Sequence, residues 1–228
     1  MDKTKIVGLS GNQLKVIAAI SMTIDHIGVM IFPEIELLRI IGRLALPIFA
    51  YMIAEGYVHT KNRLKYVLTL FSVALLCQVV YFVAMRSLEQ CILVTFLMSV
   101  LLIFSYDMAR KKRSFVHVGT FIAAIVAVFA ICQVIPIYIN GFSVDYGFFG
   151  AVLPLLIYTG RTKNEKLLRL ALGLLFITLV LNGVQGYSML AIIPLYFYNS
   201  KRGKLRMKYF FYIYYPLHLG VIHLISML

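Results

Sequence analysis

The stretch SMTIDHIGVM, residues 21–30, lies within an apolar run (12–32) that is long enough to cross a lipid bilayer as one helix. Asp25 and His26 stand side by side in this run. An ionised side chain at the centre of a membrane helix costs about 2.5–3.5 kcal/mol on the insertion scale, and such residues usually face a polar interior and mark functional sites. The stretch therefore predicts a membrane fold with a buried polar site.

The composition of the chain agrees with a membrane fold. The 228 residues are 61% hydrophobic and 14% charged, whereas soluble domains are about 45–50% apolar and about 25% charged. The net charge of +13 does not indicate a nucleic-acid partner, because the basic residues cluster in short connections between apolar runs, as topology signals do. The three cysteines have no metal-ligand or disulfide spacing, so no metal is expected.

Apolar runs of about membrane length recur along the chain. They fall near 12–32, 36–58, 65–85, 91–109, 115–138, 144–159, 166–182, 185–199 and 209–228. This pattern predicts an all-α, polytopic membrane protein with about nine transmembrane helices in a single domain, residues 1–228. The runs 166–182 and 185–199 are short and are split by NGVQG (182–186), so they form either two tilted spans or one re-entrant hairpin.

The connections between these runs alternate in charge. The basic ones are the N-terminus with Lys3 and Lys5, HTKNRLK (59–65), RKKR (110–113), RTKNEKLLR (161–169) and KRGKLRMK (201–208). The acidic or neutral ones are PEIE (33–36), RSLEQ (86–90), NGFSVD (140–145) and NGVQG (182–186). Since basic connections stay in the cytosol, we expect a protein of the cytoplasmic membrane with a cytosolic N-terminus and an external C-terminus.

Four charged or titratable side chains fall in the outer half of the first two runs. At about 1.5 Å per residue, Asp25, His26 and Arg43 lie roughly 10 Å below the outer surface, and Arg39 lies roughly 5 Å below it. Arg39 and Arg43 are four residues apart and share a helix face. One interpretation is an ion pair that only holds two helices together. A histidine at the same level favours a functional site, because imidazole transfers protons near neutral pH.

Lys15 precedes His26 by eleven residues, which is close to three full helical turns. The two side chains therefore share one face of the helix, about 16 Å apart, with Lys15 near the cytosolic end. This stripe suits a long substrate with an anionic base and a reactive end near His26, such as a coenzyme A thioester. The alternative is that Lys15 is an ordinary interfacial anchor.

Two further segments carry candidate residues. In and beside GYVHT (56–60), Glu55 and His59 suit the mouth of a coenzyme A site, or they simply solvate a helix end. YYPLH (214–218) places Tyr215 and His218 three residues apart on one helix face, with His218 nearer the midplane. These two either line the substrate tunnel, with Tyr215 against the cofactor, or His218 is a structural histidine bonded to a tyrosine.

The spacing of Lys15 and His26 resembles the first span of the transmembrane acyltransferases, which include the acyltransferase-3 O-acetylases and the lysosomal heparan-glucosaminide N-acetyltransferase. Within that group the chain looks most like the TraX family, whose founding member N-acetylates F-type conjugative pilin. The resembling segments are KVIAAISMTIDHIG (15–28), RIIGRLALPIFAYMIAEGYVHTKNRLKY (39–66), VDYGFFGAVLPLLIY (144–158), LYFYNSKRGK (195–204) and KYFFYIYYPLHLGVIHL (208–224).

By this resemblance His26 corresponds to the catalytic histidine of the group, and Lys15 fills the paired basic position. Arg39 and Arg43 approximate the arginine motif of a neighbouring span. The acyltransferase-3 motif has two residues between its arginines, whereas three separate them here. The resemblance implies acetyl-CoA as the acyl donor.

We therefore expect acyl transfer, most simply of acetyl, from cytosolic acetyl-CoA to an amine or hydroxyl at the outer face. The acceptor is a peptide amine, a sugar or a lipid-linked glycan. His26 acts as general base or is transiently acylated, Arg43 and Arg39 stabilise the oxyanion, and Asp25 pairs with an arginine. The alternatives are a proton-coupled transporter or flippase that uses the same buried residues as a relay, and a non-catalytic membrane scaffold.

Overall fold

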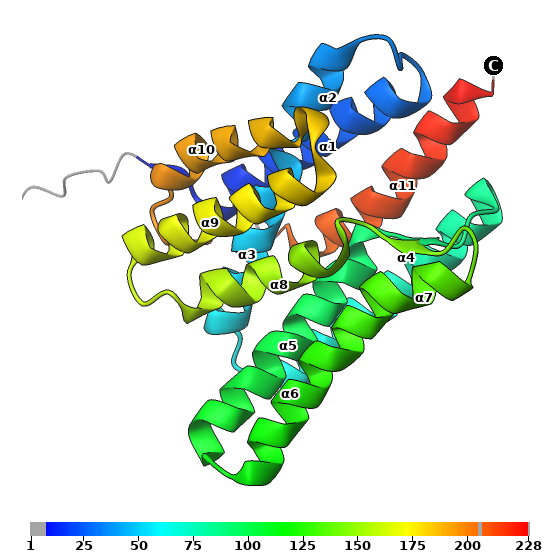
Figure 1. The fold of residues 1–228 in the computed structure, drawn as a ribbon. Helices are drawn as coiled ribbons and strands as arrows, with labels where there is room; N and C mark the ends of the chain where they lie inside the picture. The colour runs from blue at the N-terminus through cyan, green and yellow to red at the C-terminus, as the bar shows by residue number, and fades with distance from the viewer. Residues whose placement is uncertain (1–7, 205–206, 228) are drawn as a thin grey trace, which may run out of the picture. The chain divides into compact units, whose positions relative to one another are not determined.

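The fold comes from a computed structural model, which describes residues 8–204 and 207–227. The described chain is almost entirely helical (Figure 1). Lys3 and Lys5 of the expected cytosolic N-terminus, and residues 205 and 206 of the last basic connection, lie outside the described residues. The contacts divide the chain into two compact units, and each is described by itself: Met1–Met52 with Asn182–Leu228, and Ile53–Leu181.

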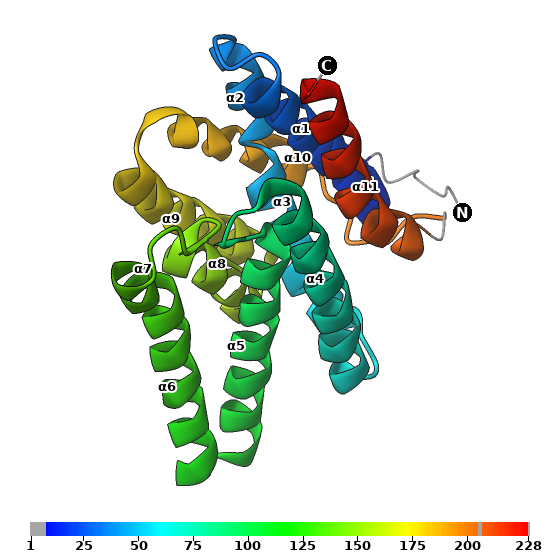
Figure 2. The ribbon, with the colours of Figure 1, turned by 90° about the vertical axis from the view of Figure 1, so that its right-hand side faces the viewer.

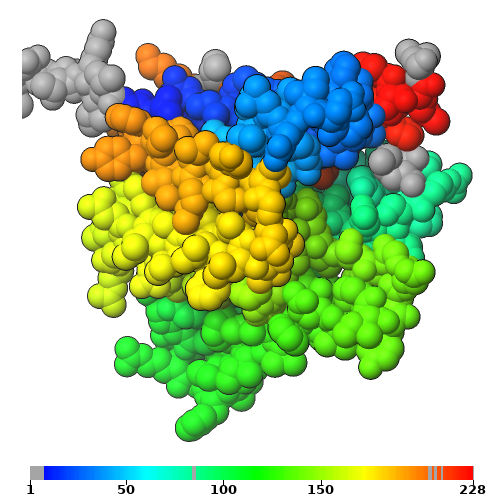
Figure 3. Space-filling view, turned by 45° about the horizontal axis from the view of Figure 1, so that its top comes forward, coloured from blue at the N-terminus to red at the C-terminus, as the bar shows by residue number. Residues whose placement is uncertain are grey.

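The first unit is organised around its N-terminal helix. Its helices are α1 (Gly11–Met30), α2 (Glu36–Gly42), the first half of α3 (Ala45–His59), the 3₁₀ helix η2 (Gly183–Ala191), α10 (Ile192–Tyr196) and α11 (Lys208–Ser226). A capping box starts α1, because Ser10 and Gln13 bond each other's backbone N–H through their side chains. Both α2 and α11 pack against α1 (Figure 2), and η2 lies beside α2 (Figure 3).

The predicted run 36–58 is interrupted near its start. The first helical segment, α2, ends before Arg43, and α3 begins after Leu44. Pro47 explains the break, because it lacks the N–H that a continuous helix would donate to the Arg43 carbonyl, and its ring crowds that carbonyl. The N–H of Arg43 is shared between the Arg39 carbonyl and the Ile40 carbonyl, both at 3.2 Å, so the last turn of α2 is tightened. Arg43 is therefore the C-cap of α2 rather than an interior helix residue.

The second unit is a set of helices packed around α5. It contains the end of α3, α4 (Arg63–Met85), α5 (Ile92–Lys112), α6 (Phe115–Phe129), the π-helix η1 (Ala130–Val134), α7 (Ile135–Tyr138), α8 (Gly147–Thr159) and α9 (Lys163–Leu181). The short strands β1 (Glu89–Gln90) and β2 (Ser143–Val144) pair in parallel. Helix α5 packs against α4, α6 and α8, and α8 packs against α9 (Figure 1).

A buried carboxylate fixes one end of this second unit. Asp107, near the end of α5, is 1% exposed. It accepts a hydrogen bond from Arg63 at the start of α4 and another from the Tyr158 hydroxyl of α8 at 3.1 Å, and it lies 3.3 Å from Lys111 Nζ. A buried charge needs such partners to offset its desolvation. The contacts tie the ends of three helices together.

Five helical segments of the described chain are long and apolar enough to cross a membrane. They are Gly11–Met30, Glu36–His59, Arg63–Val83, Ile92–Lys112 and Phe115–Tyr138. Gly147–Thr159 and Ile213–Ser226 are apolar but shorter. The expected multi-pass helical membrane protein is confirmed in this form, with five membrane-length segments against the nine crossings predicted. The run 185–199 forms η2 and the short α10. Whether 166–199 forms two short tilted spans or one re-entrant hairpin stays a prediction.

The charge alternation makes a prediction about the two ends of the segment Phe115–Tyr138. Lys112 and Asn140 flank it and are both exposed, and we expect Lys112 in the cytosol and Asn140 outside. In a chain without its native cysteines, Asn140→Cys should react with a membrane-impermeant maleimide in intact cells. Lys112→Cys should react only after permeabilisation. Labelling of Lys112→Cys in intact cells would reverse the assigned orientation.

Candidate functional site

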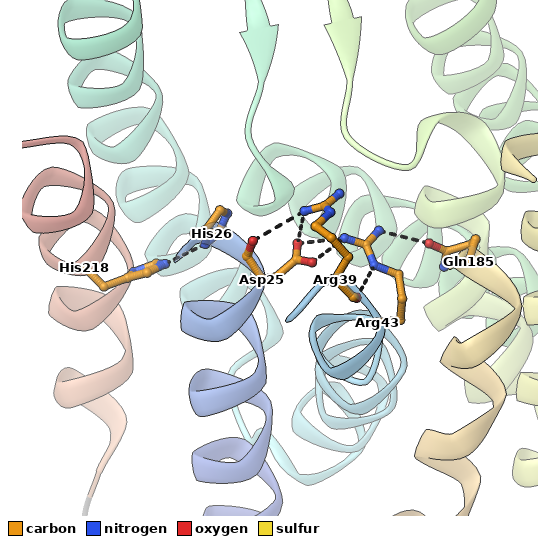
Figure 4. Close-up of polar contacts among 6 residues, drawn as sticks. All are labelled: Asp25, His26, Arg39, Arg43, Gln185 and His218. Atoms are coloured by element: carbon orange, nitrogen blue, oxygen red, sulfur yellow. Dashed lines mark hydrogen bonds and ion pairs between the residues drawn. The ribbon is translucent and has the colours of Figure 1, made fainter. Parts of the chain in front are cut away.

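A carboxylate shared by two arginines lies at the contact of α1 with α2. Asp25 accepts from Arg43 Nη2 through Oδ1 at 2.6 Å and through Oδ2 at 2.7 Å. Arg39 Nη1 lies 3.0 Å from Oδ2 of the same carboxylate (Figure 4). The exposed fractions of the Asp25, Arg39 and Arg43 side chains are 15%, 29% and 9%. The predicted pairing of Asp25 with Arg43 is therefore present, and Arg39 joins it.

Gly42 allows the two helices to approach closely enough for this ion cluster. A Cβ atom at position 42 would overlap the carboxylate and the Cβ of Asp25. Any larger residue would therefore push α2 away from α1 and lengthen the contacts with the arginines.

Arg43 is committed to contacts within the protein. Its Nε donates to the Arg39 carbonyl at 3.2 Å, its Nη1 donates to Gln185 Oε1 at 3.1 Å, and its Nη2 serves Asp25. Arg39 differs, because only its Nη1 forms a hydrogen bond or ion pair within residues 8–204 and 207–227. Its larger exposed fraction leaves the other guanidinium nitrogens able to reach a ligand.

Gln185 and Ser188 were not singled out from the sequence, where Gln185 was only one letter of the neutral NGVQG. The 3₁₀ helix η2 buries both side chains, to 3% and 0% exposure. Residues three apart share a face of a 3₁₀ helix. Gln185 Nε2 and Ser188 Oγ have no hydrogen-bond partner among the described residues. Because a buried donor without an acceptor costs about 1–3 kcal/mol, we expect an oxygen atom of water or of a ligand beside them.

A pair of histidines joins α1 to α11. His26 Nδ1 and His218 Nε2 are 3.0 Å apart, and the rings lie 5.0 Å apart centre to centre (Figure 4). His218 Nδ1 is 2.9 Å from the Tyr214 carbonyl, and its ring stacks on the ring of Tyr214 with 8° between the planes. Tyr214 is in turn fixed by a 2.6 Å hydrogen bond between its hydroxyl and that of Thr23 on α1. His218 therefore lies at the level of His26, although counting residues along the chain put it nearer the midplane.

The hydrogen bonds define which nitrogen of His26 is free. A carbonyl oxygen can only accept, so the Tyr214 carbonyl requires a proton on His218 Nδ1. When both rings are neutral, His218 Nε2 then carries a lone pair and accepts from Nδ1–H of His26. His26 Nε2 consequently keeps its own lone pair, which is the form that a general base needs.

Asp25 and His26 belong to separate contact networks. The carboxylate of Asp25 accepts hydrogen bonds from the arginines, and the imidazole of His26 forms a hydrogen bond with His218. No hydrogen bond joins the two side chains within the described part of the chain, which agrees with the expectation that they do not form a triad. Adjacent residues on a helix point about 100° apart, so the two networks lie on different faces of α1.

Lys15 lies on the same face of α1 as His26, as the eleven-residue spacing predicts. Its Nζ is 5.9 Å from the ring centre of Phe211 on α11, the helix that also contacts His26. This face is covered by α11 from Phe211 to His218. A substrate that extends from Lys15 to His26 would therefore run between α1 and α11.

The three remaining predicted residues, Tyr215, Glu55 and His59, each contact another residue of the protein. Tyr215 is buried with its ring edge against His218, at 5.5 Å between ring centres. In the second unit, Glu55 is buried and lies 2.5 Å from Lys166 Nζ. His59 Nδ1 lies 2.9 Å from the Glu55 carbonyl, and its side chain is 62% exposed. The exposed side chain of His59 fits helix-end solvation, whereas Glu55 is held in a buried ion pair. A role for either residue in cofactor binding stays a prediction.

The ion cluster makes a prediction about stability. Asp25→Asn leaves the Arg43 guanidinium buried without its counter-ion, and stranding one charge of a buried pair costs about 3–5 kcal/mol. We expect the lower end of this range, because the Asp25 side chain is 15% exposed. The free energy of unfolding in mixed detergent micelles measures it, with exposed Glu89→Gln as the matched control. The double change Asp25→Asn, Arg43→Gln should recover part of the loss, and no recovery would contradict a pairwise origin.

Almost the whole chain is similar to known proteins. A family described as TraX protein matches residues 10–226. The probable fimbrial assembly protein FimC, serogroup H1, of Dichelobacter nodosus is 26% identical over 243 residues, which covers 95% of each chain. The uncharacterized protein RP591 of Rickettsia prowazekii (strain Madrid E) is 52% identical over 44 residues, which covers 19% of this chain and 17% of the relative. No solved structure matches.

Proposed function

Because the chain belongs to the TraX family, we propose that it is an acyltransferase of the cytoplasmic membrane. It moves an acyl group, most simply acetyl, from cytosolic acetyl-CoA to an amine or hydroxyl at the outer face. The observation that carries the proposal is the imidazole of His26 in a membrane-length helix. Its Nδ1 is engaged by His218, which leaves the lone pair of Nε2 for the substrate.

In the proposed reaction, His26 first takes up a proton and later gives it back. The acceptor nitrogen or oxygen attacks the thioester carbonyl carbon while His26 Nε2 takes the proton that it loses. The tetrahedral oxyanion then collapses and breaks the carbon–sulfur bond, and the His26 imidazolium returns the proton to the coenzyme A sulfur. The products are the acylated acceptor and free coenzyme A. In the variant path, Nε2 itself attacks the thioester and then passes the acyl group on.

We assign the oxyanion contact to Arg39 rather than to Arg43. A guanidinium stabilises developing charge when its donors point at the reacting atom and are not already used. The donors of Arg43 serve Asp25, Gln185 and a backbone carbonyl, whereas Arg39 is bonded through Nη1 alone and is the more exposed of the two. Arg43 then positions Asp25, and Asp25 positions Arg39.

The donor would bind along α1. Its phosphates are attracted by the ammonium of Lys15 and by the basic connections, since charge-assisted contacts are the strong ones for phosphate. The pantetheine arm would then run between α1 and α11 toward His26, past Tyr215. This path accounts for the eleven-residue spacing of Lys15 and His26 without any further charged group inside the membrane.

The acceptor at the outer face is proposed to be a peptide amine, with a sugar or a lipid-linked glycan as the other candidates. The Dichelobacter nodosus relative is named a probable fimbrial assembly protein, and this supports a protein subunit of a surface fibre as the first acceptor to test. The family and this relative give no support to the transporter alternative.

His26→Ala tests the chemical step. The variant should insert, fold and bind labelled acetyl-CoA like the wild type, because the imidazole is about three helical turns from Lys15. Acyl transfer to envelope acceptors, measured by mass spectrometry, should fall by about 10²–10⁴-fold, the usual contribution of a general base. The control is His223→Ala, which removes the imidazole of a different histidine, on α11, and should leave acyl transfer at the wild-type level. Full activity of His26→Ala, or absence of acetyl-CoA binding by the wild type, would contradict the proposal.

A series at His218 tests whether this residue positions His26. His218→Gln can offer an oxygen near the place of Nε2 and should keep most of the activity. His218→Asn can still bond the Tyr214 carbonyl but offers no acceptor to His26, so transfer should fall toward the His26→Ala level while the KM for acetyl-CoA stays unchanged. His218→Leu, which fills the space without polar atoms, should behave like His218→Asn. Equal activity of the Gln and Asn variants would contradict the positioning role.

Nitrogen-15 NMR of histidine-labelled protein reads the same contact without an activity assay. The ring signals of His26, identified by their loss in His26→Ala, should show a proton on Nδ1 and none on Nε2 in the wild type and in His218→Gln. In His218→Asn the proton should redistribute between the two nitrogens. A proton on Nε2 of His26 in the wild type would overturn the assigned hydrogen-bond direction.

A further inference from the structure

The second unit has a groove that the proposed acyl transfer does not use. It has a volume of about 610 Å³ and lies where α5, α6, α8 and α9 approach one end of the unit. Its floor is formed by Leu155 and Leu156 of α8, and one wall carries the rings of Tyr106 and Phe121 from α5 and α6. These two rings are packed edge to face, 5.4 Å apart. Part of the groove is therefore lined by apolar side chains, two of them aromatic.

Two of the helices that line the groove, α6 and α9, expose apolar side chains. Helix α6 begins the membrane-length segment Phe115–Tyr138, and its Val116 and Ile122 are exposed. On α9, Leu168 and Leu172 are exposed as well. Exposed apolar side chains on a membrane helix contact acyl chains. The groove thus lies among helices whose exposed apolar side chains suit a lipid environment.

Charged side chains form the rim at the end of the groove. Arg161 follows the end of α8, and Arg169 on α9 is fixed by a 2.8 Å hydrogen bond from its Nη1 to Thr159 Oγ1. Glu165 also lines the groove, and its Oε2 accepts from the Arg161 backbone N–H at 2.9 Å. That hydrogen bond lowers the pKa of Glu165, so it stays ionised at neutral pH. Two arginines and one glutamate give the rim one net positive charge.

We propose that this groove binds an anionic phospholipid, with the phosphate between Arg161 and Arg169 and an acyl chain along Leu155 and Leu156. Apolar lining residues beside a cationic rim match the two parts of such a lipid. Tyr106 adds a ring of the kind that prefers the headgroup level. One net positive charge suits a lipid of net charge −1, such as phosphatidylglycerol, better than a zwitterionic lipid. The inference rests on the second unit alone and is independent of the acyl transfer.

Native mass spectrometry of the full chain, released from detergent with added lipid, tests the proposal. The wild type should retain phosphatidylglycerol over phosphatidylcholine. The double variant Arg161→Gln, Arg169→Gln should weaken retention of phosphatidylglycerol by roughly fivefold for each arginine removed. The matched control Arg110→Gln, Lys112→Gln removes two exposed positive charges from the end of α5, outside the groove, and should leave retention unchanged.

Glu165→Gln provides a test that misfolding cannot mimic. It removes the negative charge from the rim but keeps an oxygen for the Arg161 N–H, so retention of phosphatidylglycerol should increase. Equal retention of the two lipids by the wild type, or equal losses in both double variants, would overturn the proposal. Displacement of the lipid by glycerol 3-phosphate or coenzyme A would overturn it too, because the groove would then bind a soluble phosphate.

Discussion

The carboxylate of Asp25 is the group on which the first unit depends. A charge moved from water into a low-dielectric interior loses several kcal/mol of solvation, and it recovers this only through close partners of opposite charge. Arg39 and Arg43 of α2 are two such partners, and their guanidinium nitrogens lie within 3.0 Å of the carboxylate oxygens. This requirement brings α1 and α2 together at Gly42, where only a missing side chain leaves enough room. Arg43 extends the same network to η2 through Gln185.

The ion cluster also separates two roles that adjacent letters in the sequence appear to combine. Because Asp25 is neutralised by arginines on one face of α1, it does not compete for the imidazole of His26 on another. The imidazole instead takes its orientation from a neutral partner, His218, whose own proton is fixed by a backbone carbonyl. A carboxylate partner would instead hold an imidazole protonated over a wider pH range.

Much of the site followed from the sequence because helix geometry is regular. A rise of 1.5 Å per residue and a three-residue turn were enough to place Asp25 and Arg43 at one depth, and three turns were enough to place Lys15 and His26 on one face. Pro47 indicates a helix break near Arg43, but the prediction of one continuous run over 36–58 did not take it into account. Gln185 and Ser188 were missed because η2 is a 3₁₀ helix, whose period of three residues does not stand out in an apolar segment. The level of His218 depends on how α11 packs against Thr23 and His26, which counting residues along α11 does not determine.

The two networks of α1 differ in how soon they form as the chain is synthesised. Arg39 and Arg43 follow Asp25 by 14 and 18 residues. Both counter-ions of Asp25 are therefore synthesised within seconds of it. His218 follows His26 by 192 residues, which at about 5–20 residues per second is a delay of roughly 10 to 40 seconds. During that interval Asp25 already has its arginine partners in the chain, whereas His26 still lacks His218. A partly made chain would therefore have the ion cluster without the histidine pair, which can form only after translation reaches α11.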